Sequence, residues 1–387
     1  MDISFHYFAV KAVARAAGYD DTRAQRIAEF SQFIDDYNWY SYFRAVNIPK
    51  YIKEDDLDIV YNETLNIINP VTTGFYDKFD MATLILPRPQ KYTVSAFHFI
   101  PQNKDRVNAR DNRTIPATLN DGSYISTMLQ GLKNDIKSNE VSESDALMRM
   151  GMLFHTFADT YAHQLFTGYA ESLNSVKLIS VYNHANKKDE TQKYHYWIEE
   201  WIKKAEKSIK VKLPTIGHMA IAHIPDLTHI SFKMEYRDVD GKTKSHSRNN
   251  ITTFVDACKQ LYDFMRDILG DSVPANMGWD QLKERLANGF CYDATEVLDK
   301  SEKEAVNALS SHWKSKFPND YNFSYSSEDI KSSFIQAELN DSCTVNINGE
   351  ERKLFGKEYS DDFYKFNYYA DKHLISLYGK HPRNLLS

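Results

Sequence analysis

The chain has 387 residues, a formal net charge of −6 and 13% aromatic residues. This length allows one to three domains, and the acidic balance excludes the broad basic field of a nucleic-acid binder, so no stable nucleic-acid complex is expected. No apolar run reaches the roughly 18 residues of a transmembrane helix, and the start of the chain lacks the pattern of a signal peptide. Three widely spaced cysteines suit a reducing compartment, so we expect a cytoplasmic protein.

Apolar residues repeat with helical spacing along most of the chain. They predict helices over residues 3–17, 21–37, 124–138, 143–166, 194–209, 250–269, 279–289, 294–316, 327–339 and 361–378. The stretch 80–122, rich in Pro, Asn and Asp, predicts a long loop. Asp240-Gly241 and Asn348-Gly349 predict the turns of two hairpins. We expect a mainly α fold with one or two small β-hairpins, a metal-binding helical core over 1–235, and a helical extension over 236–387.

Three polar residues stand in the apolar helix predicted for 143–166. His155, Asp159 and His163 are four residues apart, and each such step turns about 40° around a helix, so their side chains follow one stripe. Imidazole and carboxylate groups are ligands of zinc and similar ions. Two interpretations stay open: a metal site, or two hydrogen-bonded core histidines beside an acid. An uncompensated carboxylate in an apolar segment is costly, which favours the metal.

Other histidines and acids recur in short motifs elsewhere in the chain. These are Asp2 and His6 in "MDISFHYF", Asp35 in "FIDDYNW", His98 in "SAFHFI", His195 and Glu199 in "YHYWIEEW", and His218 and Asp226 in "IGHMAIAHIPD". Each motif alone is more typical of ordinary structure. Together they offer ligands for two or three metal ions.

In this order the motifs resemble the zinc-dependent phospholipase C and single-strand nuclease superfamily. They are more similar still to an uncharacterised bacterial branch whose members begin with MDI-x-FHYY and carry an HTFADTxAHQ block. The resemblance covers residues 1–235. It implies a multi-helix bundle that holds two or three zinc ions and hydrolyses a phosphate-containing substrate.

The resemblance also implies which residues bind each ion. The implied sets are Asp35, His98, His155 and Asp159 for the first ion, His163, His218 and Asp226 for the second, and His6 with a bridging Asp159 for the third. The acid of the second set is open between Asp226 and Glu199, because Ala222 stands where the superfamily has its acid. His163 also stays in helical register, whereas the superfamily places that histidine further along the chain. Asp2 either replaces an N-terminal amine as a ligand or only favours the helix dipole.

Phosphate ester hydrolysis is the reaction that the resemblance implies, with Asp35 also orienting the attacking water. Four arginines of the predicted loop either meet a phosphate or are solvated: Arg88, Arg106, Arg110 and Arg113. Two other functions stay open. One is a non-catalytic scaffold stabilised by metal, and the other is a membrane-surface binding protein, suggested by the basic stretch at 201–212.

Overall fold

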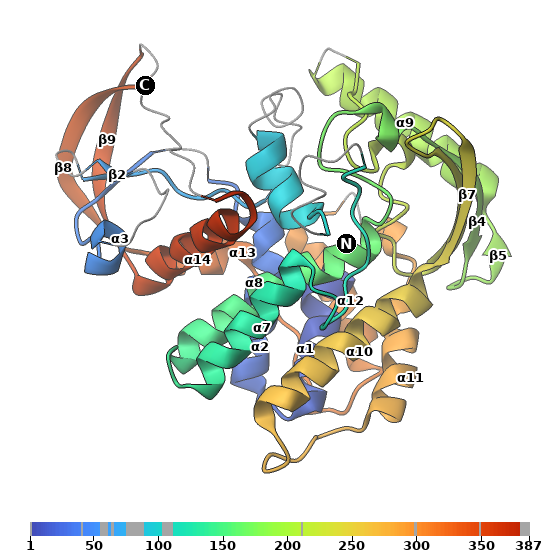
Figure 1. Cartoon of the computed structure of the whole chain (residues 1–387), viewed down its shortest axis with the longest axis horizontal. Helices are drawn as coiled ribbons and strands as arrows, with labels where there is room; N and C mark the ends of the chain where they lie inside the picture. Colours follow the sequence, from blue (N-terminus) through green and yellow to red (C-terminus); the bar gives the residue numbers. More distant parts are fainter. Residues whose placement is uncertain are drawn as a thin grey trace. The chain divides into compact units, whose positions relative to one another are not determined.

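The computed structural model describes residues 2–39, 42–54, 61–62, 66–74, 89–102, 111–209, 212–297, 300–347 and 350–379 (Figure 1). Contacts divide the chain into two compact units. Unit 1 comprises Met1–Ile34 and Phe75–Tyr325, and unit 2 comprises Asp35–Gly74 and Ser326–Ser387. Each unit is therefore built from segments that are distant in the sequence.

Unit 1 is mostly helical. Its α-helices are α1 (Val10–Ala17), α2 (Asp21–Asp36, whose last two residues open unit 2), α7 (Tyr124–Lys137), α8 (Glu143–Ala162), α9 (Thr191–Ile209), α10 (Asn250–Leu269), α11 (Trp279–Phe290) and α12 (Glu302–Lys314). Its π-helical segments are η1 (Ser4–Ala9) and η2 (Gln90–His98), and its 3₁₀ turns are η3 (Ser172–Asn174), η4 (Met219–Ile221) and η5 (Ala294–Glu296).

Helix α8 lies at the centre of this unit. Ser142 caps its N-terminus by accepting a hydrogen bond from the Asp145 amide. Every residue of α8 from Met150 to Ala162 is buried, because η1, η2, α7 and α10 all pack against the helix (Figure 1). A helix that is buried on every side is usually apolar all round, so the polar residues His155 and Asp159 of α8 need partners inside the protein. Gly151 allows α2 to approach closely, since a Cβ atom there would lie 2.9 Å from the Ser31 amide nitrogen.

Unit 1 also contains an antiparallel sheet of four strands. In spatial order these are β5 (Lys188–Asp189), β4 (Val176–Asn183), β6 (Ile230–Arg237) and β7 (Thr243–Asn249). The β6–β7 hairpin turns at Asp240-Gly241, as the sequence predicts, with Gly241 at φ +78°. Helix α9 packs against β4 (Figure 1). The expected domain boundary at 235–236 falls inside strand β6.

Unit 2 is built around a sheet of five strands. Its spatial order is β2 (Tyr61–Asn62), β3 (Ile67–Ile68), β1 (Phe43–Ala45), β9 (Glu350–Tyr359) and β8 (Ile335–Ile347). The β1–β9 pair is parallel and the others are antiparallel. The helices of this unit are α3 (Lys50–Glu54), α13 (Ser327–Ser333) and α14 (Asp361–Tyr378). Phe366 of α14 packs against Tyr37 and Phe334.

The expected fold class, a mainly helical bundle with one or two small hairpins, is wrong. The two sheets make the protein a mixed α/β structure. Strand β4 was missed although "VKLISVYN" is rich in β-branched residues, and β1 to β3 have only two or three residues each, too few for a periodic pattern. The helix expected over 327–339 ends at Ser333, after which β8 begins.

The loop expected over 80–122 also needs correction. Residues 75–88 and 103–110 lie outside the described part of the chain, but Gln90–His98 is helical. Pro89 precedes this segment with helical backbone angles. A proline ring suits the first turn of a helix, so this proline marks a helix start rather than a loop. His98 consequently stands on the last turn of η2, which fixes its direction.

Candidate metal centre

Three imidazole rings place a nitrogen within 3.2 Å of the Asp159 carboxylate, and Nδ1 of His163 lies 3.7 Å from its Oδ2 atom. Its Oδ1 atom lies 3.1 Å from Nε2 of His6, and its Oδ2 atom lies 3.2 Å from both Nδ1 of His98 and Nε2 of His155. The side chains of Asp159 and these three histidines are buried, with exposed fractions of 0–2%. We call these four residues the first cluster. Its members come from η1, η2 and α8, so residues distant in sequence converge on one acid.

Backbone contacts set the proton positions in the first cluster. Nδ1 of His155 lies 2.8 Å from the carbonyl oxygen of Ser31, which can only accept, so Nδ1 carries the proton. The Nε2 lone pair of His155 therefore faces the cluster, where Nδ1 of His98 lies 3.1 Å away. The His6 ring stacks on the His155 ring with centroids 3.8 Å apart. Three imidazole nitrogens and two carboxylate oxygens thus point into a small volume, an arrangement typical of a metal site.

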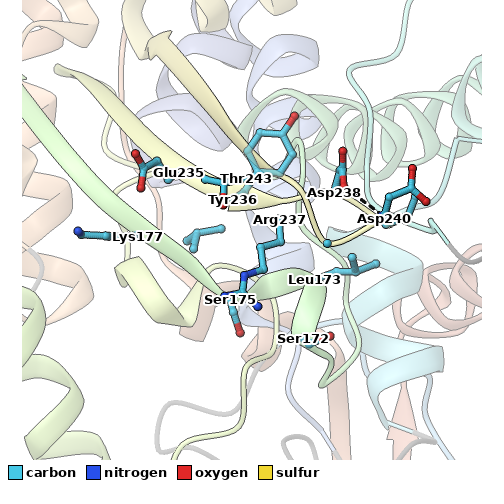
Figure 2. Close-up of a pocket in the computed structure, with 13 residues that line it drawn as sticks. Ser172, Leu173, Ser175, Lys177, Glu235, Tyr236, Arg237, Asp238, Asp240 and Thr243 are labelled. Carbon is cyan, nitrogen blue, oxygen red and sulfur yellow. Dashed lines mark hydrogen bonds between the residues drawn. The ribbon is translucent and has the colours of Figure 1, made fainter.

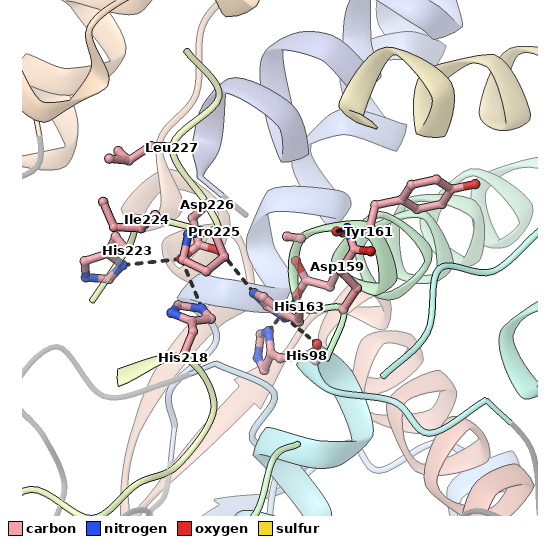
Figure 3. Close-up of polar contacts among 12 residues, drawn as sticks. His98, Asp159, Tyr161, His163, His218, His223, Ile224, Pro225, Asp226 and Leu227 are labelled. Atoms are coloured by element: carbon pink, nitrogen blue, oxygen red, sulfur yellow. Dashed lines mark hydrogen bonds and ion pairs between the residues drawn. The ribbon is translucent and has the colours of Figure 1, made fainter. Parts of the chain in front are cut away.

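A second cluster forms around Asp226. His163 places Nε2 at 3.1 Å from Oδ1 of this acid, and His218 places Nε2 at 3.2 Å from Oδ2 (Figure 3). The other ring nitrogens face backbone carbonyls: Nδ1 of His163 donates to the oxygen of His98, and Nδ1 of His218 donates to the oxygen of Ala222. Both histidines therefore present an unprotonated Nε2 to the acid. We call His163, His218 and Asp226 the second cluster.

The second cluster is closer to solvent than the first. The side chain of His218 is 13% exposed and that of Asp226 is 9% exposed. His223, which is 43% exposed, adds its Nδ1 atom at 3.4 Å from Oδ2 of Asp226. The rings of Trp197 and Trp201 on α9 lie beside His223, with centroids 6.4 and 5.6 Å away. A ligand from solvent therefore reaches this cluster more easily than the first.

Burial and charge act oppositely on the two acids. Burial raises the pKa of each carboxyl, but neighbouring imidazoles, chiefly His163 for Asp159 and His218 for Asp226, hold both pKa values well below the usual range. Burial lowers the pKa of His6 to about 3 and that of His218 to about 4. Both acids are therefore ionised and both of these histidines are neutral at pH 7, the protonation states that metal ligands need.

Asp2 provides a further buried carboxylate. Its Oδ1 atom accepts a hydrogen bond of 2.9 Å from the Ser4 amide, at the start of the helix that carries His6. The residue as a whole is half-buried, but Oδ2 is fully enclosed and accepts no hydrogen bond within the described part of the chain. Burial, reinforced by the charge of Asp226, raises the pKa of Asp2 to about 7. An enclosed oxygen of this kind gains strongly from a cation.

The structure also places the remaining predicted site residues. Asp35 is half-buried on the last turn of α2, one turn after Ser31, at the start of unit 2; its expected role as a ligand stays a prediction. Glu199 is exposed on α9, so Asp226 is the acid that meets His163 and His218. The guanidinium of Arg113 is held by both oxygens of Asp111 rather than left for a phosphate. Arg88, Arg106 and Arg110 lie outside the described residues.

Comparison with sequence families gives one match. The profile of a family of unknown function, DUF6765, matches residues 1–380. The chain belongs to this family. The match spans both clusters. No curated protein and no solved structure matches the chain.

The description of DUF6765 names no activity, so the resemblance to zinc-dependent phospholipases and nucleases stays a prediction. His223 is the member of the site to which the sequence interpretation assigned no ligand role. Its signal was present in the spacing His223-x2-Asp226, but His218 in the same motif took the role. Among the residues that the structure describes, none of the helices has both the length and the apolar composition that crossing a membrane requires.

A pocket of about 820 Å³ lies away from these residues, at one end of the sheet of unit 1 (Figure 2). Strands β4 and β6 and the β6–β7 turn line it, and no predicted ligand does. Its charges are mixed: Lys177 and Arg237 stand among Glu235, Asp238 and Asp240. This mixture favours no single class of ligand.

Proposed function

We propose that this protein is a metal-dependent hydrolase of phosphate esters, with zinc-type ions at the first and second clusters. The observation that carries the proposal is the pair of acids, Asp159 and Asp226, each within 3.2 Å of at least two imidazole nitrogens. We also expect the protein to act in the cytoplasm, as its charge and cysteines favour.

The donor atoms fit zinc. Neutral imidazole nitrogens and carboxylate oxygens are its usual ligands besides thiolates, and the second nitrogens of His155, His163 and His218 rest on backbone carbonyls. His6, His98, His155 and Asp159 would hold ions at the first cluster, with Asp159 as the bridge. His163, His218 and Asp226 would hold an ion at the second. Two or three ions in total remain the expectation.

Ions bound there would supply Lewis acidity and a water of lowered pKa. The protein's own residues would exclude water, admit the substrate and orient the attacking water. The first cluster, at 0–2% exposure, excludes bulk water, whereas the second cluster leaves His218 and His223 in reach of a substrate. Asp35 stays the residue expected to orient the attacking water. The indole rings of Trp197 and Trp201 would border the approach to the second cluster.

One observation favours a second candidate function, the non-catalytic scaffold. The first cluster is as closed as a structural metal site, because its four side chains leave almost no surface. A protein in which both clusters were saturated would bind metal without catalysis. Binding to a membrane surface through α9 stays a third possibility, tested by sedimentation with anionic vesicles.

The experiment combines metal analysis with an activity panel. Purified protein is assayed for bound zinc and then for hydrolysis of generic phosphomonoesters and phosphodiesters, phospholipids, single-stranded nucleic acid and cyclic nucleotides. His218→Ala is compared with His312→Ala, because His312 on α12 directs Nε2 to the Asn288 and Gly289 carbonyls and belongs to neither cluster. We expect His218→Ala to abolish hydrolysis and His312→Ala to retain it. Zinc-loaded wild type without any hydrolysis would favour the scaffold instead.

A further inference from the structure

A buried arginine connects the two chain segments that carry the second cluster. Arg248, the next-to-last residue of β7, is 6% exposed. Its Nη1 atom donates to the carbonyl oxygens of Tyr161 and Ala162, both at 2.7 Å. Its Nη2 atom donates to the oxygen of Pro225, at 2.5 Å. One guanidinium therefore holds the end of α8 and the loop before β6 together.

Asn250 completes this arrangement from the first residue of α10. It is fully buried, and its Oδ1 atom accepts a hydrogen bond of 2.7 Å from Nε of Arg248. Its amide nitrogen donates to the carbonyl oxygens of Leu227, at 2.7 Å, and Ile224, at 3.2 Å. Both side chains thus bind the backbone of residues 224–227, the segment that carries Asp226.

The bonded carbonyls stand directly beside the ligands. Ala162 is the residue before His163, and Pro225 is the residue before Asp226. Neighbouring Cα atoms are only about 3.8 Å apart, so fixing these carbonyls fixes the starting points of both side chains. By binding the carbonyls of Ala162 and Pro225, Arg248 restricts the backbone positions from which His163 Nε2 and Asp226 Oδ1 reach their 3.1 Å separation.

We propose that Arg248, supported by Asn250, is a positioning residue for the second metal centre. This inference rests on the metal binding proposed above and adds the residue that holds the backbone beside His163 and Asp226 in place. The carbonyls at the end of a helix lack partners within the helix, and a cation there is favoured by the helix dipole. A guanidinium offers several donors in fixed directions, which a lysine ammonium does not.

Arg248 remains positively charged at neutral pH although it is buried. Burial lowers the pKa of Arg248 to about 9, and the charge of Asp226 opposes that shift, so the group is a cation at pH 7. Its face also lies over the ring of Phe232, with Cζ at 4.9 Å from the ring centroid. The guanidinium is thus held at its edges by carbonyl and amide oxygens and on its face by an aromatic ring.

The first cluster serves as the internal control. Its histidine His155 is oriented by Ser31, and Asp159 lies one turn before His163 on α8. Nδ1 of His163 lies 3.7 Å from Oδ2 of Asp159, so the two clusters touch, and loss of Arg248 should weaken metal binding at the second cluster more than at the first. Changes to residues that orient ligands typically cost roughly 10–100-fold in metal affinity, and we expect a loss of this size.

The test measures zinc affinity and stoichiometry by competition with a chromophoric chelator, without any activity assay. Arg248→Met, Arg248→Lys and Asn250→Ala are compared with wild type. The matched control is Arg266→Met on α10, because Arg266 also donates to three carbonyls, those of Ala17, Gly270 and Val273. Arg266 lies roughly 24 Å from Asn250 along the axis of α10. Circular dichroism and thermal unfolding of the metal-free proteins follow the fold.

We expect Arg248→Met and Arg248→Lys to bind zinc roughly 10–100-fold more weakly at one class of sites, while the affinity of the remaining sites changes less. Arg266→Met should lower the melting temperature without changing either class. Arg248→Lys retains charge and serves where Arg248→Met does not fold. Wild-type zinc affinity in Arg248→Lys and Asn250→Ala, or equal losses in both classes, would overturn the inference and leave the proposed function standing. A wild type that binds no zinc would overturn both.

Discussion

Nε2 of His163 lies 3.1 Å from Oδ1 of Asp226, although 63 residues separate the two along the chain. His163 follows the last residue of α8, and Asp226 stands in the loop before β6. Because of this contact, His163 joins Asp226 in the second cluster while His155 and Asp159 belong to the first. Without Asp226, these three residues of one helix would face a single centre.

The two acids should differ in how many ions they hold. Asp159→Ala removes the carboxylate that faces His6, His98 and His155, so we expect the loss of every ion at the first cluster, more than one if Asp159 is a bridge. Asp226→Ala should remove one ion only. Inductively coupled plasma mass spectrometry of protein purified without chelator gives the ratio of zinc to chain. Equal zinc content in both variants and wild type would contradict metal binding at these acids.

Asp2→Asn should have opposite effects with and without metal. The raised pKa of Asp2, about 7, means that ionisation of this carboxyl opposes folding above pH 4 and does so fully above pH 7. Asparagine keeps the acceptor for the Ser4 amide and removes the charge. The metal-free variant should therefore unfold at higher temperature than wild type at pH 8, with the difference vanishing near pH 4. In excess zinc the advantage should shrink or reverse, and an unchanged advantage would show that Asp2 does not serve the metal.

Acid should destabilise the metal-free protein over a defined range. Burial lowers the pKa of His6 to about 3 and of His218 to about 4, below their value of 6.5 in an unfolded chain. The unfolded state therefore binds more protons between about pH 6.5 and 4, so the free energy of unfolding falls as pH decreases through this window. Urea unfolding from pH 8 to pH 4 measures the slope. A free energy that stays constant between pH 6.5 and 4 would contradict it.

That slope should be steeper in Asp2→Asn. The carboxyl of Asp2 gains protons in the folded state as pH falls from 7 to 4, which offsets part of the histidine effect. Replacing Asp2 by asparagine removes this proton uptake, so the free energy of unfolding should fall more steeply between pH 7 and pH 4.

Gly151→Ala should displace the Ser31 carbonyl that orients His155 in the first cluster. A Cβ atom at this position would lie 2.9 Å from the Ser31 amide nitrogen and would force α2 and α8 apart. The Ser31 carbonyl, which fixes the His155 ring, would move with α2. We expect a loss of about 1–3 kcal/mol in the free energy of unfolding, together with weaker zinc binding. Gly131→Ala on α7 is the control, because its Cβ would meet nothing within 4 Å and should stabilise the helix.

The sequence predicts long helices well and short strands poorly. The helices at 250–269 and 361–378 have the predicted bounds, since each has a polar cap and at least four regular turns. Strands β2 and β3 have two residues each and exist because neighbours pair with them, a tertiary effect that no local pattern records. The hairpin at 240–241 was predictable because its turn requires a residue such as glycine at positive φ.

The residues of the clusters were predictable as types and in order, and the resemblance also implied which of them lie together. Helical spacing placed His155, Asp159 and His163 on one stripe, and the structure keeps them there. The spacing of the motifs left the acid of the second set open between Asp226 and Glu199, and the contact with His163 identifies Asp226. Arg248 carried no signal at all, because an arginine beside a hairpin is ordinarily solvated, and its burial depends on α8 and the loop at 224–227 arriving from elsewhere.

The carbonyl groups that orient the three histidines belong to Ser31, His98 and Ala222. Every amino acid supplies the same carbonyl, so mutation at positions 31 and 222 leaves these acceptors in place as long as the chain keeps its path. Ala222, at φ +47°, is the position where that path itself is demanding. A side-chain change at these two positions therefore leaves the imidazole tautomers unchanged wherever the chain keeps its path. Divergence at such positions would be a poor guide to loss of the centre, and a survey of the family should weigh backbone conformation there above residue identity.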